Sequence, residues 1–120
     1  MQTQTQASRP SESIELWQTE WCPASHRVRQ RLTELGIAYL ARQVPVARED
    51  RIELEHSTGA RSIPVLVIGR ESIDGEEAIL AYLDTQYKET DSARAHREKA
   101  AMARRKELEA ACRESTSATP

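Results

Sequence analysis

The chain has 120 residues, of which 30% are charged, and its formal net charge is −2. This length suits one domain with a modest core. The slightly acidic balance argues against nucleic acid as a partner, because domains that bind nucleic acid usually carry a strongly basic patch. No apolar run approaches the roughly 20 residues of a membrane span. We therefore expect no nucleic-acid partner and no membrane association.

The cysteine content and the N-terminal segment both bear on the compartment. Two cysteines, Cys22 and Cys112, can form at most one disulfide, which does not suggest a disulfide-stapled secreted domain. Segment 1–13 is rich in Gln, Thr and Ser and lacks the apolar stretch of a signal peptide. We expect this segment to be a disordered tail and the protein to be cytoplasmic.

The first half of the chain alternates strand and helix signals. Residues 14–17 alternate apolar and polar side chains and predict a strand. After a loop at 18–22, Pro23 is suited to the first turn of a helix that Gly36 ends. Residues 37–46 predict a second strand. Residues 48–58 predict a second helix, with Ile52 and Leu54 facing inward and Gly59 ending it.

The next segment completes one domain at residues 14–89. The nearly continuous apolar run 63–68 predicts a buried strand, and 71–73 a short return strand after a turn at 69–70. A third helix follows, with apolar residues from 78 to 83 and Asp74 as its cap. The order β-α-β-α-β-β-α predicts an α/β fold, a four-stranded mixed sheet with helices on both faces.

Residues 90–120 read as a charged helical extension with a frayed end. Ser92 is a candidate cap for a helix reaching about Arg113. Its apolar side is thin, so docking on the domain or a partner and simple solvation both remain open. We expect the extension to be dispensable for the chemistry and Cys112 to be neither a resolving thiol nor a metal ligand. The rival hypothesis is that the tail folds back and delivers Cys112 to Cys22.

Cys22 is the residue on which the functional hypothesis depends. It follows a predicted strand and directly precedes a predicted helix, whose free N–H groups and dipole stabilise an anion. A cysteine placed there has a lowered pKa and more of the nucleophilic thiolate. His26 and Arg27 add positive potential, and Glu20 acts against it. The competing interpretation is a buried structural cysteine.

The position three residues after Cys22 is Ser25, which cannot form a disulfide. Ser25 either donates a hydrogen bond to the Cys22 sulfur or fills the first helical turn. A mixed disulfide on Cys22 therefore has to be resolved by a thiol from solution. Ile63–Pro64 opens the apolar run, where proline is unusual. A cis peptide bond explains it and would turn the Ile63 backbone outward toward a peptide-like ligand.

These segments together resemble the three ligand-binding segments of glutaredoxins, which have the thioredoxin-like fold. The last segment is also similar to that of glutathione S-transferase N-terminal domains. The resemblance covers residues 14–87 and rests on Cys22-Pro23-Ala24-Ser25, Ser62-Ile63-Pro64-Val65 and Gly75-Glu76-Glu77-Ala78-Ile79. It implies that Cys22 is the nucleophile, that Ile63 binds the cysteinyl part of glutathione beside Pro64, and that Glu76 and Glu77 hold the γ-glutamyl end.

The chain departs from the family pattern at two places. Thr19 stands where glutaredoxins usually carry Lys, and Glu77 stands where the transferases usually have Ser. Arg61 is a candidate for the missing positive charge, and the co-substrate is either glutathione or another low-molecular-weight thiol such as mycothiol. With Ser25 in place of a second cysteine, the resemblance implies a monothiol thiol–disulfide oxidoreductase acting on thiolated proteins. We expect it to be a monomer and to need no metal. The alternative is a non-catalytic thiol-binding module or one that bridges an iron–sulfur cluster.

Overall fold

The computed structural model describes residues 13–117, with side chains described as far as Arg113. The expected disordered tail therefore lies outside the described residues, apart from Ser13. None of the helices within this range is long and apolar enough to cross a membrane. In chain order the elements are β1 (Ile14–Gln18), α1 (Pro23–Glu34), β2 (Leu40–Gln43), a 3-10 turn (Arg48–Asp50), α2 (Ile52–Thr58), β3 (Val65–Ile68), β4 (Glu71–Asp74), α3 (Glu76–Gln86) and α4 (Ala93–Ser117).

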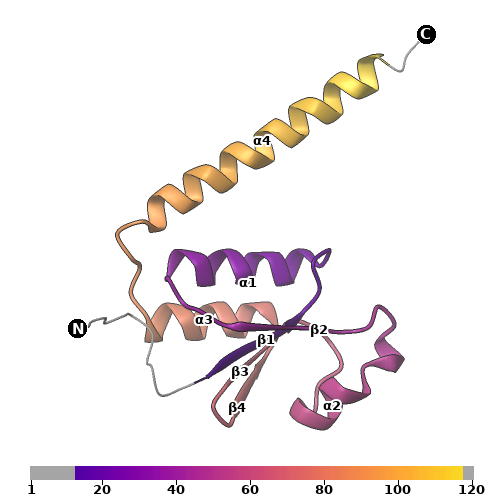
Figure 1. Cartoon of the computed structure of the whole chain (residues 1–120), viewed down its shortest axis with the longest axis vertical. Helices are drawn as coiled ribbons and strands as arrows, with labels where there is room; N and C mark the ends of the chain where they lie inside the picture. The colour runs from indigo at the N-terminus through magenta and orange to yellow at the C-terminus, as the bar shows by residue number, and fades with distance from the viewer. Residues whose placement is uncertain (1–12, 118–120) are drawn as a thin grey trace.

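The strands form one sheet in the order β2-β1-β3-β4. β1 and β2 are parallel, whereas β3 runs antiparallel to both β1 and β4. Helices α1 and α3 cover one face of the sheet and α2 lies on the other (Figure 1). The expected four-stranded mixed sheet with flanking helices is confirmed.

Each face of the sheet has its own hydrophobic core, because side chains alternate along the strands. The larger core joins the α1 and α3 side with residues of β1 and β3: Ile14, Leu16, Val28, Leu32, Leu35, Ile37, Leu66, Ile68, Ile79, Leu83 and Tyr87. The smaller core lies under α2 and contains Trp17, Val44, Leu54 and Val65. The sheet is thus held in place from both sides.

Two details of the β2–α2 region differ from the sequence prediction. The second strand covers only Leu40–Gln43 and is shorter than 37–46, because the Ile37 N–H donates to the Leu32 carbonyl at the end of α1, at 3.0 Å, and its side chain packs in the larger core. The second helix is interrupted at Arg51, where φ and ψ are −86° and 56°. Ile52 begins α2 with 65% of its surface exposed, so only Leu54 faces inward.

Capping of α3 also differs from the prediction. Gly75, with φ 98°, is the residue before the helix, and no side chain caps it. Asp74 is the last residue of β4 and is exposed. The φ of Gly75 lies in a region that glycine alone adopts readily. This glycine therefore makes the sharp turn from β4 into α3.

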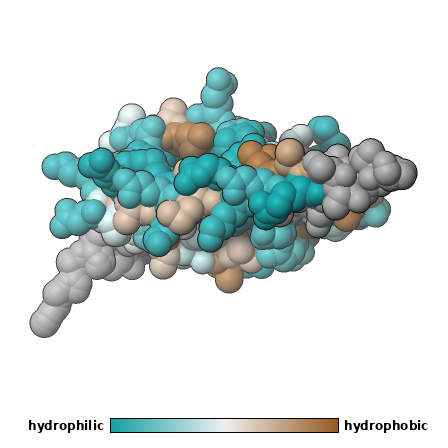
Figure 2. Space-filling model, turned by 90° about the horizontal axis from the view of Figure 1, so that it is seen from above, coloured by the Kyte–Doolittle hydropathy of each residue, from teal (hydrophilic) through white to brown (hydrophobic). Residues whose placement is uncertain are grey.

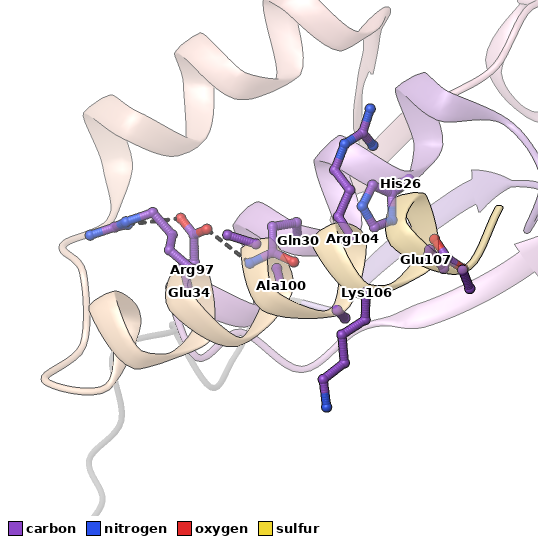
Figure 3. A pocket seen from close by; sticks show the side chains of 11 residues that line it. His26, Gln30, Glu34, Arg97, Ala100, Arg104, Lys106 and Glu107 are labelled. Atoms are coloured by element: carbon purple, nitrogen blue, oxygen red, sulfur yellow. Dashed lines mark hydrogen bonds and ion pairs between the residues drawn. The ribbon is translucent and has the colours of Figure 1, made fainter. Parts of the chain in front are cut away.

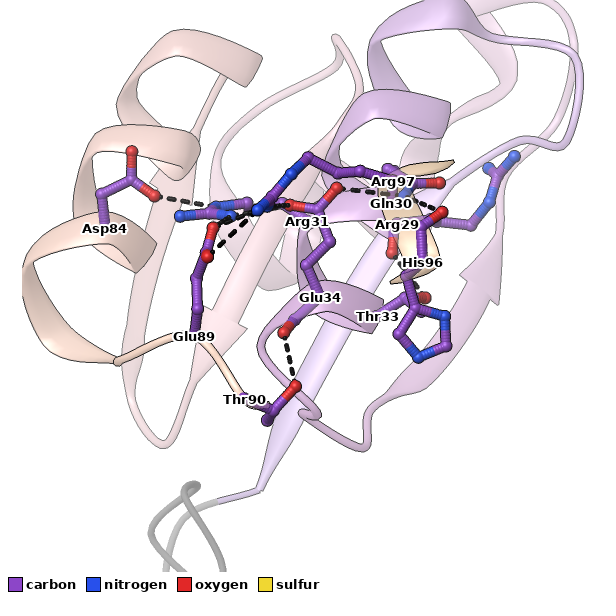
Figure 4. Close-up of polar contacts among 10 residues, drawn as sticks. All are labelled: Arg29, Gln30, Arg31, Thr33, Glu34, Asp84, Glu89, Thr90, His96 and Arg97. Atoms are coloured by element: carbon purple, nitrogen blue, oxygen red, sulfur yellow. Dashed lines mark hydrogen bonds and ion pairs between the residues drawn. The ribbon is translucent and has the colours of Figure 1, made fainter. Parts of the chain in front are cut away.

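The C-terminal extension is helical, and its first turns are tied to the domain by ion pairs (Figure 4). The buried carboxylate of Glu34 accepts hydrogen bonds from Arg31 at 2.7 Å and from Arg97 of α4 at 3.0 Å. Both arginines also pair with Glu89, at 2.6 and 2.7 Å, and Arg31 binds Asp84 of α3. We call Arg31, Glu34, Asp84, Glu89 and Arg97 the α1–α4 charge network. It docks the start of α4, whereas Leu108, further along, is 62% exposed.

Gly36 offers a test of how closely the chain after α3 packs against the end of α1. Its φ is 67°, and a Cβ there would lie 2.8 Å from Cγ2 of Thr90. Gly69 has a similar φ of 59° but open space around it. We expect Gly36→Ala to lower the free energy of unfolding more than Gly69→Ala, which incurs only the backbone cost of about 1–2 kcal/mol. Urea unfolding checks this, and equal losses would contradict the packing.

The charge network predicts a dependence of stability on pH. Hydrogen bonds from Arg97 and Arg31 lower the pKa of Glu89 to about 2. A carboxylate whose pKa is lower in the folded state adds stability above its unfolded pKa of about 4.3 and loses it as the pH falls toward 2. The difference in Tm between the wild type and Glu89→Gln should therefore be constant near neutrality and vanish toward pH 2. Glu71→Gln, outside the network, is the control, and a difference that persists at pH 2 would contradict this assignment.

Candidate functional site

Cys22 occupies the N-cap position of α1. Its φ and ψ are −79° and 119°, which is extended backbone, and Pro23 takes the first helical position. The Cys22 sulfur accepts a hydrogen bond from the Ser25 N–H at 3.4 Å, and the Cys22 carbonyl accepts one from the His26 N–H at 2.9 Å. The thiol is half-buried and forms no disulfide with Cys112, which is exposed. Cys22 thus lies where free helix N–H groups stabilise a thiolate.

The loop that carries Cys22 is held by an arginine of α1. Arg29 donates to the backbone carbonyls of Thr19 at 3.1 Å and Glu20 at 3.4 Å, and also to the side chain of Gln18. The planar guanidinium can satisfy several acceptors at once. The loop from β1 to α1 is therefore fixed by α1 itself, and this fixes Cys22 at the helix start.

The pKa of the Cys22 thiol lies below its ordinary value. Burial raises it, but the hydroxyl and N–H of Ser25, the N–H of Ala24 and the positive charge of Arg27 together outweigh that effect. The Ser25 hydroxyl is fully buried and has no hydrogen-bond partner of standard geometry among the described residues. Its proton is therefore available to the sulfur when Cys22 ionises, which supports the hydrogen-bonding interpretation of Ser25.

A second arginine holds the loops that flank Pro64. The buried Arg51 side chain donates to the carbonyls of Pro45 at 2.9 Å, Val46 at 3.0 Å and Arg61 at 2.9 Å. The Ile63–Pro64 peptide bond is cis, as the sequence predicted. Pro64 is fully buried, and the side chain of Ile63 packs against the smaller core. Arg51 therefore joins the loop after β2 to the loop before β3.

Strand pairing brings the three predicted segments together at one end of the sheet, where β1 and β4 end and β3 begins. Trp17 near the end of β1 pairs with Val65 at the start of β3, and Val65 pairs with Asp74 at the end of β4. The Gly75 N–H then donates to the Pro64 carbonyl at 3.0 Å. The segments that follow β1, precede β3 and follow β4 are consequently neighbours, although they are distant in sequence.

Arg27 connects the cysteine end of the site to the start of α3. It makes a two-point ion pair with Glu76, one contact of which is 3.0 Å from Nη2 to Oε1. This contact holds the pKa of Glu76 below its usual range. The same guanidinium lowers the pKa of Cys22 by its charge. Arg27 is thus shared between the nucleophile and the predicted binding end.

The other predicted binding residues differ in their exposure and in the contacts that they make. Glu77 is exposed on the first turn of α3. Arg61 is bound to Glu55 at 2.5 Å and to the carbonyls of Arg48 and Glu49. The roles of Arg61, Ile63, Glu76 and Glu77 in ligand binding remain predictions. Arg29 and Arg51 were missed from the sequence because no motif marks an arginine that binds carbonyls from distant loops.

The described residues contain no cluster of candidate metal ligands. Within residues 13–117, no group of three or more His, Cys, Asp or Glu side chains is arranged to hold a metal ion. The chemistry available to the described site is that of one activated thiolate beside a hydroxyl and an arginine.

The arrangement of cysteine, cis-proline and sheet defines a thioredoxin-like fold. Residues 14–73 match the glutaredoxin family model, and the chain belongs to the glutaredoxin family. No curated protein sequence matches the chain.

Solved structures of glutathione transferases resemble this domain. A rice transferase (OsGSTU1), solved in complex with glutathione, is 25% identical with a TM-score of 0.54, covering 61% of this chain and 33% of that one. A transferase homologue from Drosophila mojavensis with bound glutathione is 24% identical with a TM-score of 0.59, covering 68% and 38%. A diazinon-metabolizing silkworm (Bombyx mori) transferase is 23% identical with a TM-score of 0.57, covering 63% and 39%. The chain therefore spans less than two fifths of each of these neighbours.

The geometry of Cys22 predicts its reactivity. In a Cys112→Ser background, the rate of alkylation by iodoacetamide should rise with pH around a midpoint below the free-thiol value of about 8.5. Arg27→Ala should move that midpoint upward, because it removes the positive charge that favours the thiolate. Arg94→Ala on α4 is the matched control and should leave it unchanged. A midpoint equal to that of a cysteine peptide would contradict the assignment.

Proposed function

We propose that this chain is a monothiol thiol–disulfide oxidoreductase that reduces mixed disulfides between proteins and a low-molecular-weight thiol. One observation carries the proposal: Cys22 is at a helix N-terminus with a lowered pKa, and the residue one turn on is Ser25 rather than a second cysteine. A thiolate that lacks a resolving partner favours chemistry in which a second small thiol completes the cycle.

The reaction proceeds by two thiol–disulfide exchanges. The Cys22 thiolate attacks the small-thiol sulfur of the mixed disulfide. A bond forms between these two sulfurs, the disulfide bond to the substrate protein breaks, and the substrate leaves as a thiolate that takes up a proton. A second small thiol, as its thiolate, then attacks the sulfur bound to Cys22 and regenerates the Cys22 thiolate. The net result is that one mixed disulfide and one free small thiol become one reduced protein thiol and one small-molecule disulfide.

Glutathione is the first candidate for the small thiol. The family and the glutathione complexes of its structural neighbours support it. We propose that the Ile63 backbone and Pro64 align the cysteinyl part, and that Glu76 and Glu77 receive the γ-glutamyl ammonium. Arg27, beside Glu76, offsets the negative charge that would repel the adjacent ligand carboxylate. Arg61, which the sequence singled out for this purpose, already contacts Glu55.

Reduction of a glutathionylated peptide, coupled to glutathione reductase and NADPH, tests the proposal. Cys22→Ser should abolish turnover, because the thiolate that attacks the mixed disulfide is lost. Ser25→Ala should retain most of the activity, because the Ser25 backbone N–H still binds the sulfur. Cys112→Ser should be as active as the wild type. Mass spectrometry of the protein treated with oxidised glutathione should find the adduct on Cys22.

Three results would overturn the proposal. Activity retained in Cys22→Ser would exclude Cys22 as nucleophile. Loss of activity in Cys112→Ser, with a Cys22–Cys112 disulfide in the oxidised protein, would establish a dithiol mechanism instead. Absorbance at roughly 320–420 nm that is lost with Cys22 would indicate cluster bridging. If glutathione fails and another small thiol supports turnover, the mechanism stands and the co-substrate changes.

A further inference from the structure

Residues of α1 and α4 line a groove (Figure 3). Helix α4 lies on the far side of α1 from the sheet (Figure 1). Its volume is about 1020 Å³. His26 and Gln30 of α1 form one wall, and small residues of α4, Ala100, Ala103 and Ala110, form much of the other. The helices are joined near Glu34 and Arg97 and diverge from there along α4. The groove is therefore open where α4 leaves the domain.

At the open end of the groove, the charged residues of α4 have no ion-pair partner among the described residues. Near the start of the helix, Arg94 pairs with Glu98. Arg97 pairs with Glu34 and Glu89. Arg104, Lys106 and Glu107 also line the groove, but no described residue forms an ion pair with them. Figure 3 shows Arg104 and Glu107 near His26, at the end away from Arg97. The charges at the open end of the groove are thus unmatched by any described residue of the same copy.

The order of these charges matches a second copy running in the opposite direction. The basic run 104–106 is followed directly by Glu107-Leu108-Glu109. If two α4 helices lie antiparallel about a two-fold axis at this junction, the basic groove residues of each, Arg104 and Lys106, face the acidic Glu107 of the other. A parallel pair would set like charges against each other, which is destabilising. A two-fold axis makes every such contact occur twice and closes the assembly.

The apolar character of the helix agrees with this arrangement. Alanine side chains on both sides of the charged junction allow two backbones to approach closely, and Leu108 is 62% exposed beside them. A helix that projects from its domain is marginal in water when it buries little area. From the α4 side, the surface is mainly hydrophilic with separate hydrophobic patches (Figure 2). Specificity in such an interface has to come mainly from charge matching.

We propose that the groove between α1 and α4 is filled by α4 of a second copy of this chain. The two copies form a closed two-fold dimer in which Arg104 of each faces Glu107 of the other. This proposal differs from the monomer expected from the sequence. It is independent of the proposed reductase function, since it concerns residues on the far side of α1 from the sheet and is tested by mass.

Sedimentation equilibrium of the full chain and of charge-swapped variants tests the dimer. The wild type should show a concentration-dependent mass that reaches two chains. Arg104→Glu and Glu107→Arg should each raise the dimer Kd at least about tenfold, because each sets like charges opposite one another at two symmetric points. The double variant Arg104→Glu/Glu107→Arg has the wild-type composition and should dimerise again. An equimolar mixture of the two single variants should form a heterodimer, because all facing charges are then opposite.

Arg105→Glu is the matched control, since Arg105 does not line the groove. It should dimerise like the wild type, and far-UV circular dichroism should show equal helix content in all variants. A wild type that stays monomeric up to roughly 1 mM overturns the proposal. Single swaps that leave the Kd unchanged also overturn it, as does a mixture of them that does not associate. The reductase assay is unaffected by any of these results, so the two proposals fail separately.

Discussion

The site depends on the antiparallel pairing of β3 with both β1 and β4. Because Val65 pairs with both Trp17 and Asp74, the residues beyond them must meet at one end of the sheet. The register is held by burial on both faces: Leu16 and Leu66 enter the larger core, while Trp17 and Val65 enter the smaller one. A slip of one residue would exchange the faces. The hydrophobic cores therefore determine where the cysteine and proline segments lie.

Arginine side chains then fix the loops at that end of the sheet. Arg29 binds the carbonyls of the loop before Cys22, and Arg51 binds carbonyls of the two loops around β2 and β3. Arg27 joins α1 to the start of α3 through Glu76. A guanidinium presents five donors in a fixed plane, so one side chain can satisfy acceptors from different segments. Loops without regular pairing thereby gain a defined geometry around a single thiol.

Much of this was readable from local patterns in the sequence. The positions of Pro23, Gly36 and Gly59 mark helix ends correctly, because the backbone preferences of proline and glycine are local properties. The placement of Cys22 at a helix start and the cis bond before Pro64 follow from the same kind of evidence. The extent of β2 was overestimated, since an apolar residue such as Ile37 is buried equally well by a loop that enters the core.

Long-range polar contacts required the tertiary structure. The sequence singled out Arg61 as a charge for the site, but Glu55 and two carbonyls already bind it. Arg27, one turn after the cysteine, instead faces Glu76. Helical periodicity gives the face on which Arg27 lies, but its partner comes from an element 49 residues away in sequence. That choice depends on the packing of α1 against α3.

The C-terminal helix shows the same division. Its sequence, rich in alanine and charged residues without glycine, determines that it is helical and that the order of its charges reverses between 104–106 and 107–109. Only the tertiary structure decided that Arg97 joins Glu34 and Glu89. It also decided that Arg104, Lys106 and Glu107 line an open groove without an ion-pair partner among the described residues. Helix formation is governed by neighbouring residues, whereas an ion pair requires two distant segments to be brought within 4 Å by the fold.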